Sequence, residues 1–138
     1  MHVQAYLNFN GRCEEALTFY REALGAEVTA MMRFEQSPDA GACDGHVPPG
    51  SGHKVMHSAL KIGESTVMAS DCECQGQPNF QGVSLALSPA TPEAAERAFA
   101  ALAAGGQVHM PLGRTFWSPC FGVVADKFGL SWMISVPA

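Results

Sequence analysis

The sequence lacks the charge pattern of a nucleic-acid-binding protein and the long apolar run of a membrane protein. Only 8 of its 138 residues are Lys or Arg, against 13 Asp or Glu, which gives a formal net charge of -5. Binding to a phosphate backbone needs clustered cations that displace counterions, so we expect no nucleic-acid partner. No stretch approaches the roughly 20 apolar residues of a membrane span, so we expect no membrane partner.

Targeting signals and several enzyme motifs are also missing. Met1-His2-Val3-Gln4 has no basic segment followed by an apolar run, so it does not predict a signal peptide. The five cysteines are an odd number, which predicts reduced thiols and a cytoplasmic location rather than a disulfide framework. No G-x-S-x-G, P-loop or G-x-G-x-x-G motif occurs, which argues against a serine hydrolase, a nucleotide hydrolase and a dinucleotide enzyme.

What the chain does contain is an internal repeat. With a shift of 80 residues, Leu7 falls on Leu87, Phe19 on Phe99 and Gly25 on Gly105. Each copy begins with an alternating strand, continues as an amphipathic helix closed by glycine and returns as a strand. A duplicated βα unit restricts the fold to a few choices.

The periodicity predicts two helices and eight strands in one domain that is 47% hydrophobic. The helices are expected at 13–24 and 92–104, with Gly25 as a left-handed C-cap and Thr91 as an N-cap. The strands are expected at 3–9, 27–34, 55–62, 65–70, 81–88, 107–116, 121–126 and 131–136. Toward the end of each copy the shift falls to about 65, because loop 37–54, rich in Gly and Pro, is an insertion in the first copy.

Several motifs resemble those of a known family. The opening Tyr6-Leu7-Asn8-Phe9-Asn10-Gly11, with Glu15-Ala16 and Phe19-Tyr20, is similar to the start of PhnB-like proteins of the vicinal oxygen chelate superfamily. Met68-Ala69-Ser70-Asp71 resembles the end of their first module. The C-terminal series Phe116-Trp117, Phe121-Gly122, Asp126-Lys127-Phe128-Gly129 and Trp132-Met133-Ile134 resembles their closing motif.

The resemblance implies an α+β fold, the glyoxalase/bleomycin-resistance/dioxygenase fold. Two tandem βαβββ modules, 1–71 and 80–138, would form curved sheets around a cleft within a single domain, 1–138. The resemblance also implies a homodimer. Some PhnB-like proteins have been labelled ubiquinone methyltransferases, but this chain lacks the glycine-rich turn of a doubly wound sheet that a methyl donor normally needs.

Metal-dependent members of the superfamily carry ligands on the first and last strands of each module. Carried over residue by residue, these positions fall on Gln4 or Ala5, on Met68 or Ala69, on Ser84 and on Met133. None of them is a carboxylate, and thioethers suit only soft ions. We therefore expect no cofactor and no metal at these positions, which counts against glyoxalase, extradiol dioxygenase and thiol-transferase chemistry.

Two other groups of residues offer weaker metal-binding patterns. The first is Cys43-Asp44-Gly45-His46 with His53 and His57, and the second is Cys72-Glu73-Cys74. Neither has a C-x-x-C pair matched by a second pair, so ordinary loop residues and thiols explain them as well.

Polar side chains on the cleft side of the predicted strands are the candidates for substrate binding. Gln4, Tyr6 and Asn8 share one face of the first strand, and Ser84 lies on the first strand of the second copy. Met68, Met133 and Trp117 would supply apolar walls, whereas the parity of the last strand places Trp132 in the core. The alternative is a solvated sheet face that binds nothing.

His57 and Asp71 are the candidate catalytic residues. His57 lies inside a predicted strand and could act as a general base, with Asp71 orienting it or binding a cationic group. A structural histidine and a strand-end turn residue are the alternatives. The sequence therefore leaves three functions open: a metal-free binder of a small organic molecule, a lyase or isomerase that uses His57 and Asp71 or a loop metal, and an interaction module without a ligand.

Overall fold

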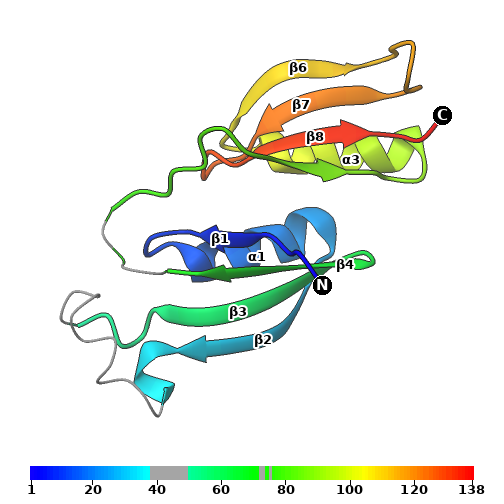
Figure 1. Ribbon diagram of the computed structural model, residues 1–138. Coiled ribbons are helices and arrows are strands. Elements are labelled where there is room, and N and C mark those ends of the chain that lie inside the picture. The colour runs from blue at the N-terminus through cyan, green and yellow to red at the C-terminus, as the bar shows by residue number, and fades with distance from the viewer. Residues whose placement is uncertain (38–49, 72–73, 75) are drawn as a thin grey trace. The chain divides into compact units, whose positions relative to one another are not determined.

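The computed structural model describes residues 1–37, 50–71, 74 and 76–138, and it divides into two compact units, Met1–Pro78 and Asn79–Ala138. Each unit is a four-stranded mixed sheet with one long helix on one face, in agreement with the predicted α+β fold (Figure 1). The first unit contains β1 (Tyr6–Asn8), α1 (Cys13–Leu24), β2 (Glu27–Arg33), the 3-10 turn η1 (Phe34–Gln36), β3 (Val55–Ile62) and β4 (Ser65–Ser70). The second contains β5 (Ser84–Leu87), α3 (Pro92–Ala103), β6 (Gln107–Gly113), β7 (Phe121–Ala125) and β8 (Ser131–Ser135).

Local chemistry accounts for both ends of α1 and for the start of α3. α1 has Glu14 and Glu15 in its first turn, where the helix dipole favours negative charge. Gly25 closes it in the left-handed conformation, with φ of 65°. Thr91 caps α3 by accepting a hydrogen bond from the amide of Ala94 at 3.2 Å, as predicted.

The two sheets have the same topology. The strand orders are β1-β4-β3-β2 and β5-β8-β7-β6, and in each sheet the first pair is parallel and the others are antiparallel. Tyr6 pairs with Met68 in the first unit, and Ala86 pairs with Met133 in the second. Tyr6 and Ala86 are 80 residues apart in the chain, and Met68 and Met133 are 65 apart. The structure therefore confirms both shifts of the repeat.

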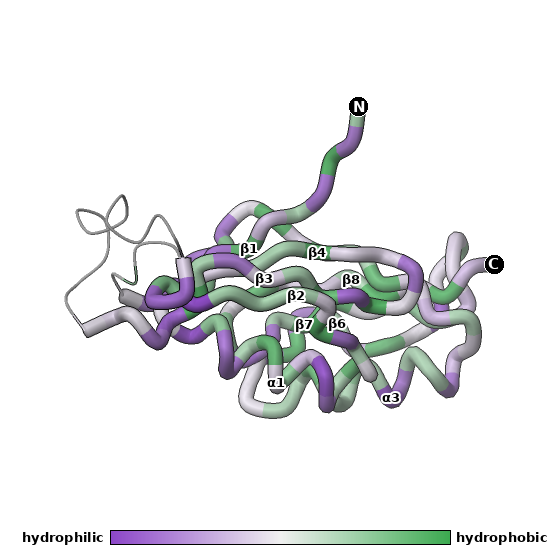
Figure 2. The backbone as a smooth tube through the Cα atoms, turned by 90° about the horizontal axis from the view of Figure 1, so that it is seen from below, coloured by the Kyte–Doolittle hydropathy of each residue, from purple (hydrophilic) through white to green (hydrophobic). Residues whose placement is uncertain are grey.

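Each helix packs its apolar side against one face of its own sheet. In the first unit the fully buried side chains include Tyr20 on α1 and Leu60 on β3. In the second they include Leu102 on α3 and Trp132 on β8, so the prediction that Trp132 is a core residue is confirmed. Apolar and polar residues alternate along both helices in Figure 2, as expected of helices with one face on a sheet.

Three strands are shorter than the sequence predicts by three or four residues. β1 is limited to Tyr6–Asn8 and β5 to Ser84–Leu87, both at sheet edges, where a strand has a partner on one side only. β6 stops at Gly113 rather than at residue 116. β6 stops there because the hydroxyl of Thr115 accepts hydrogen bonds from the amides of Trp117 and Ser118. These bonds form a turn in place of the backbone hydrogen bonds between strands.

Some sequence predictions fall outside the described part of the chain. These are the Cys43–His46 segment and residues 72 and 73 of the Cys72-Glu73-Cys74 group. Among the helices that the structure describes, none has the length and apolar character needed to cross a membrane.

Candidate functional site

The face of the first sheet that α1 leaves uncovered carries four of the nine predicted site residues. Leu7 on β1 and Ser58 on β3 are buried on the helix side, so their neighbours in sequence point to the opposite face. That face, here called the first open face, carries Tyr6, Asn8, His57 and Met68. The prediction that Tyr6 and Asn8 share a face opposite the apolar side of their strand is confirmed. The structure also decides between Met68 and Ala69, because Met68 lies on the open face and Ala69 on the helix side.

Tyr6 and His57 form a polar pair on this face. The phenol oxygen of Tyr6 lies 3.1 Å from Nδ1 of His57, within hydrogen-bond distance. Their ring centroids are 5.7 Å apart and the rings are tilted by 36°. Tyr6 is 51% exposed, so the pair is open to a ligand from solvent. The strand topology alone brings these two residues together, since they are separated by 51 positions in the chain.

Met32 also lies on this face, although no sequence pattern predicted it. It lies on β2 directly opposite His57, whereas Val28 on the same strand lies opposite the helix-facing Leu60. Simple alternation would put Val28 and Met32 on the same side. A β-bulge at Thr29 reverses the parity between them. A one-residue bulge leaves no signal in the hydrophobic pattern, so the sequence could not identify Met32.

Two other predicted binding residues make local contacts. Nε2 of Gln4 donates to the carbonyl oxygen of Thr66 at 3.4 Å, a long bond that holds the N-terminal segment along β4. Oδ1 of Asn8 accepts from the amide of Asn10 at 2.9 Å and so shapes the turn into α1. Asn8 therefore has at least a structural role.

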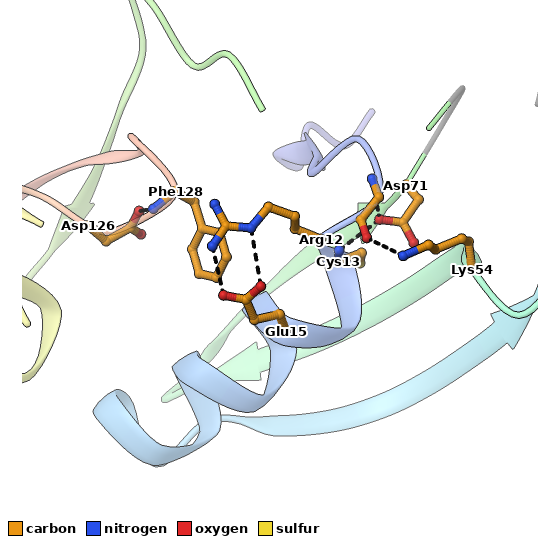
Figure 3. Close-up of polar contacts among 8 residues, drawn as sticks. Arg12, Cys13, Glu15, Lys54, Asp71, Asp126 and Phe128 are labelled. Carbon is orange, nitrogen blue, oxygen red and sulfur yellow. Dashed lines mark hydrogen bonds and ion pairs between the residues drawn. The ribbon is translucent and has the colours of Figure 1, made fainter. Parts of the chain in front are cut away.

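Asp71 is a structural residue in this fold. Its side chain is 1% exposed, and Oδ1 accepts from the amides of Gly11 at 2.8 Å and Cys13 at 2.7 Å. Oδ2 accepts from the amide of Val55 at 2.8 Å. Figure 3 shows this carboxylate beside Cys13 and Lys54 at the start of α1. The carboxylate thus caps α1 and ties it to β3, and the hydrogen-bond partner of His57 is Tyr6.

Burial and neighbouring charge shift two further ionisable groups near the start of α1. Burial of the Cys13 thiol, aided by the charge of Asp71, raises its pKa to about 12. The pKa of Glu14 is lowered, chiefly by its hydrogen bonds with Arg33. The high pKa makes Cys13 a poor nucleophile, so it is a core residue rather than a reactive thiol.

The second sheet has a corresponding uncovered face, here called the second open face. Trp132 and Ile134 on β8 are buried toward α3, so Met133 between them points the other way and is 40% exposed. Met133 pairs with Ala86 and Val123 across the neighbouring strands, and Ser84 lies further along β5. The predicted orientation of Met133 away from the helix is confirmed.

Trp117 is held on a rigid turn between β6 and β7. Oγ1 of Thr115 accepts from the amides of Trp117 at 3.3 Å and Ser118 at 3.0 Å. The indole packs edge-on against Phe121, with ring centroids 5.2 Å apart, and Phe121 shares the strand parity of Val123 on the second open face. Trp117 nevertheless remains 49% exposed. A fixed, half-exposed indole of this kind can take part in binding an apolar ligand.

The four positions taken from metal-dependent relatives do not form a suitable donor set for their usual ions. They offer the amide of Gln4 and the thioether of Met68 in the first unit, and the hydroxyl of Ser84 and the thioether of Met133 in the second. In residues 1–37, 50–71, 74 and 76–138, no group of three or more His, Cys, Asp or Glu side chains is placed to hold a metal. The donor chemistry therefore does not fit a hard or borderline divalent ion.

Comparisons with known proteins agree with this fold and place it in a family. The Glyoxalase family, described as the Glyoxalase/Bleomycin resistance protein/Dioxygenase superfamily, matches residues 2–134. Protein YjdN of Escherichia coli is 35% identical to the chain, covering 99% of the chain and 95% of YjdN.

Two solved structures resemble the chain over nearly its full length. Protein PA1353 from Pseudomonas aeruginosa is 38% identical with a TM-score of 0.84, covering 99% of this chain and 98% of that one. A PhnB protein from Bacillus cereus, named a putative 3-demethylubiquinone-9 3-methyltransferase, is 27% identical with a TM-score of 0.79, covering 99% of both chains. The chain therefore belongs to the glyoxalase/bleomycin resistance protein/dioxygenase superfamily, in its PhnB- and YjdN-like branch.

Proposed function

We propose that this protein binds a small organic molecule on the open faces of its sheets, without the metal that many relatives use. The observation that carries the proposal is the Tyr6–His57 pair, a hydrogen-bonded polar group on an accessible sheet face. Met68 is paired with Tyr6 on the neighbouring strand, and Met32 is paired with His57. Small-molecule sites commonly combine apolar walls with a few oriented polar groups.

The second open face supports the same proposal. Met133 and Trp117 leave large apolar surfaces exposed to solvent, where a globular domain gains nothing from them. The Thr115 turn fixes the backbone of Trp117, so little conformational entropy would be lost when a ligand packs against the indole.

The donor chemistry supports binding without a metal. Gln4, Met68, Ser84 and Met133 provide two thioethers, an amide and a hydroxyl, and a transition-metal or magnesium site normally needs carboxylate, imidazole or thiolate ligands. Recognition on these faces would then depend on shape, apolar contact and hydrogen bonds from Tyr6 and His57.

The test is a binding screen with a matched pair of variants. Met31 and Met32 are adjacent on β2 and are 40% and 39% exposed, but they point to opposite faces. We would screen a fragment library by ligand-observed NMR, after native mass spectrometry of protein purified without a metal-affinity tag. Met32→Lys should weaken the binding of fragment hits at least tenfold, since a methionine that a ligand buries contributes about 1.5–3 kcal/mol. Met31→Lys should leave binding unchanged.

Two outcomes would overturn the proposal. One is a wild-type protein that carries no small molecule and binds no fragment. The other is equal loss of binding in both methionine variants, because it would place the binding surface somewhere other than the open face.

A second candidate function is enzymatic. Tyr6 and His57 are both able to transfer protons and lie within hydrogen-bond distance, which is the arrangement of a general acid–base pair in a lyase or isomerase. If this candidate is correct, His57→Gln should abolish turnover of a bound compound but leave its binding within a few-fold. An unchanged rate in that variant would contradict it.

We also propose that the protein is a cytoplasmic homodimer. The odd number of cysteines, which is typical of reduced thiols, supports the location. Family resemblance supports the dimer, and analytical ultracentrifugation would test it through a mass of one or two chains.

A further inference from the structure

We propose that Tyr6 is a positioning residue that fixes the tautomer of His57, so that Nε2–H becomes a hydrogen-bond donor to a carbonyl or carboxylate oxygen of the ligand. This inference rests on the proposed function and narrows it to one chemical class. The expected ligand has an acceptor oxygen beside an apolar body.

The contact uses one particular nitrogen of the imidazole ring. The Tyr6 oxygen is 3.1 Å from Nδ1, so the phenol hydroxyl meets the imidazole at that nitrogen. A neutral imidazole has one nitrogen that donates and one that accepts. Whichever role Nδ1 takes in this bond, Nε2 must take the other.

The chemistry of the two groups decides which of them donates. A phenol hydroxyl is a good donor and a weak acceptor because its oxygen lone pair is delocalised into the ring. A neutral imidazole nitrogen is among the stronger neutral acceptors in proteins. The favoured arrangement is therefore O–H of Tyr6 donating to Nδ1 of His57. Nδ1 then carries no proton, and the proton of the ring is on Nε2.

Nε2 remains available for a ligand. Within the described part of the chain, His57 forms its hydrogen bond with Tyr6, and this bond uses Nδ1. The charged strand residues on the first open face are Glu27 and Lys61, which lie directly opposite each other and offset one another's charge. Nε2–H is thus a neutral donor on a face without net charge, so both a ketone-like carbonyl and a carboxylate are suitable partners.

The residues around this donor determine the rest of the ligand. Met32 lies directly opposite His57 across β2 and β3, and Met68 lies diagonally from it on β4. Thioether side chains adapt to irregular apolar shapes. An acceptor oxygen bound at Nε2–H would therefore be attached to an apolar group that contacts these methionines.

The tautomer can be measured without any ligand. We would record long-range nitrogen–proton NMR spectra of uniformly ¹⁵N-labelled protein and assign the His57 signals with His57→Gln. In the wild type we expect the Nε2–H tautomer of His57. Tyr6→Phe keeps the ring but removes the hydroxyl, so it should move the His57 signals toward a mixture of tautomers. The signals of His2, His53 and His109 should stay in place, which controls for folding. An Nδ1–H tautomer in the wild type, or His57 signals unchanged by Tyr6→Phe, would overturn the inference.

A panel of small fragments tests the ligand class. The panel pairs compounds of the same apolar body: benzoate and acetophenone with an acceptor oxygen, and toluene and benzylamine without one. We expect benzoate or acetophenone to shift the His57 nitrogen signals, with binding weakened at least three-fold in Tyr6→Phe. Larger His57 shifts with toluene or benzylamine would refute the ligand class while leaving small-molecule binding intact. If the wider fragment library yields no binder, the proposed function fails together with the ligand class, whereas the tautomer result stands separately.

Discussion

Replacing Asp71 should destabilise the first unit severely, because one buried carboxylate satisfies three backbone amides. Gly11, Cys13 and Val55 each donate an N–H to it, at distances between 2.7 and 2.8 Å. In Asp71→Ala these amides lose their acceptor. A buried donor left without a partner costs about 1–3 kcal/mol, so the three together should cost about 3–9 kcal/mol. Small domains have a total stability of about 5–15 kcal/mol.

The conservative variant should show an intermediate effect. Asp71→Asn keeps one oxygen, which can still accept from Gly11 and Cys13, but its NH₂ group would face the amide of Val55 as donor against donor. We expect a loss of about 2 kcal/mol. Glu64→Ala, in the exposed turn between β3 and β4, is the control and should stay within about 0.5 kcal/mol of the wild type.

The assay combines urea unfolding with amide hydrogen exchange. Unfolding followed by circular dichroism gives the free energy of each variant, and exchange shows whether the amides of Gly11, Cys13 and Val55 lose protection. If Asp71→Ala unfolds within about 1 kcal/mol of the wild type and these amides stay protected, the reasoning is refuted. A stable Asp71→Ala protein that had lost only catalytic turnover would instead support the acid–base role predicted from the sequence.

Two further predictions concern Cys13 in the first unit and Gly106 in the second. Because the pKa of Cys13 is raised from 9.0 to about 12, the native thiol keeps its proton after the unfolded chain has lost it. The free energy of unfolding should therefore be unaffected by this group below pH 9 and fall by about 1.4 kcal/mol per pH unit above it. Urea unfolding at pH 8 and pH 10.5 should show this extra slope in the wild type relative to Cys13→Ala, and parallel profiles would contradict it. In the second unit, a Cβ on Gly106 would overlap the carbonyl oxygen of Ala125. Gly106→Ala should lower the free energy of unfolding by about 3 kcal/mol, whereas Gly113→Ala, whose Cβ would meet nothing within 4 Å, should be nearly neutral. Thermal unfolding compares the two, and an equal loss in both would show that the close approach at Gly106 is not the cause.

Most of the fold was predictable because its determinants are local. The apolar spacing of 13–24 and the glycine after it predict α1, and the Thr91-Pro92 pair predicts the start of α3. The alternation around Trp132 and Met133 predicts which of the two is buried. These features depend on a few neighbouring residues, and the repeat supplies a second copy of each pattern.

The candidate site was predicted only in part. Tyr6, His57 and Met68 were identified because each lies on a strand with recognisable alternation. The sequence did not predict the Tyr6–His57 contact, because pairing between distant strands leaves no local signal. It also did not predict the bulge that turns Met32 to the same face, because a one-residue bulge leaves none either.

The sequence by itself therefore determined the repeat, the two helices, the faces of the regularly alternating strands and the family, since all of these follow from short-range patterns and ordered motifs. Only the tertiary structure decided the partners of the polar groups. Asp71 is followed by residues of the inter-module linker, yet its carboxylate caps a helix 58 positions earlier in the chain, at Cys13. Burial and hydrogen-bond demand in three dimensions, rather than proximity in sequence, assigned Asp71 to the scaffold and left His57 to pair with Tyr6.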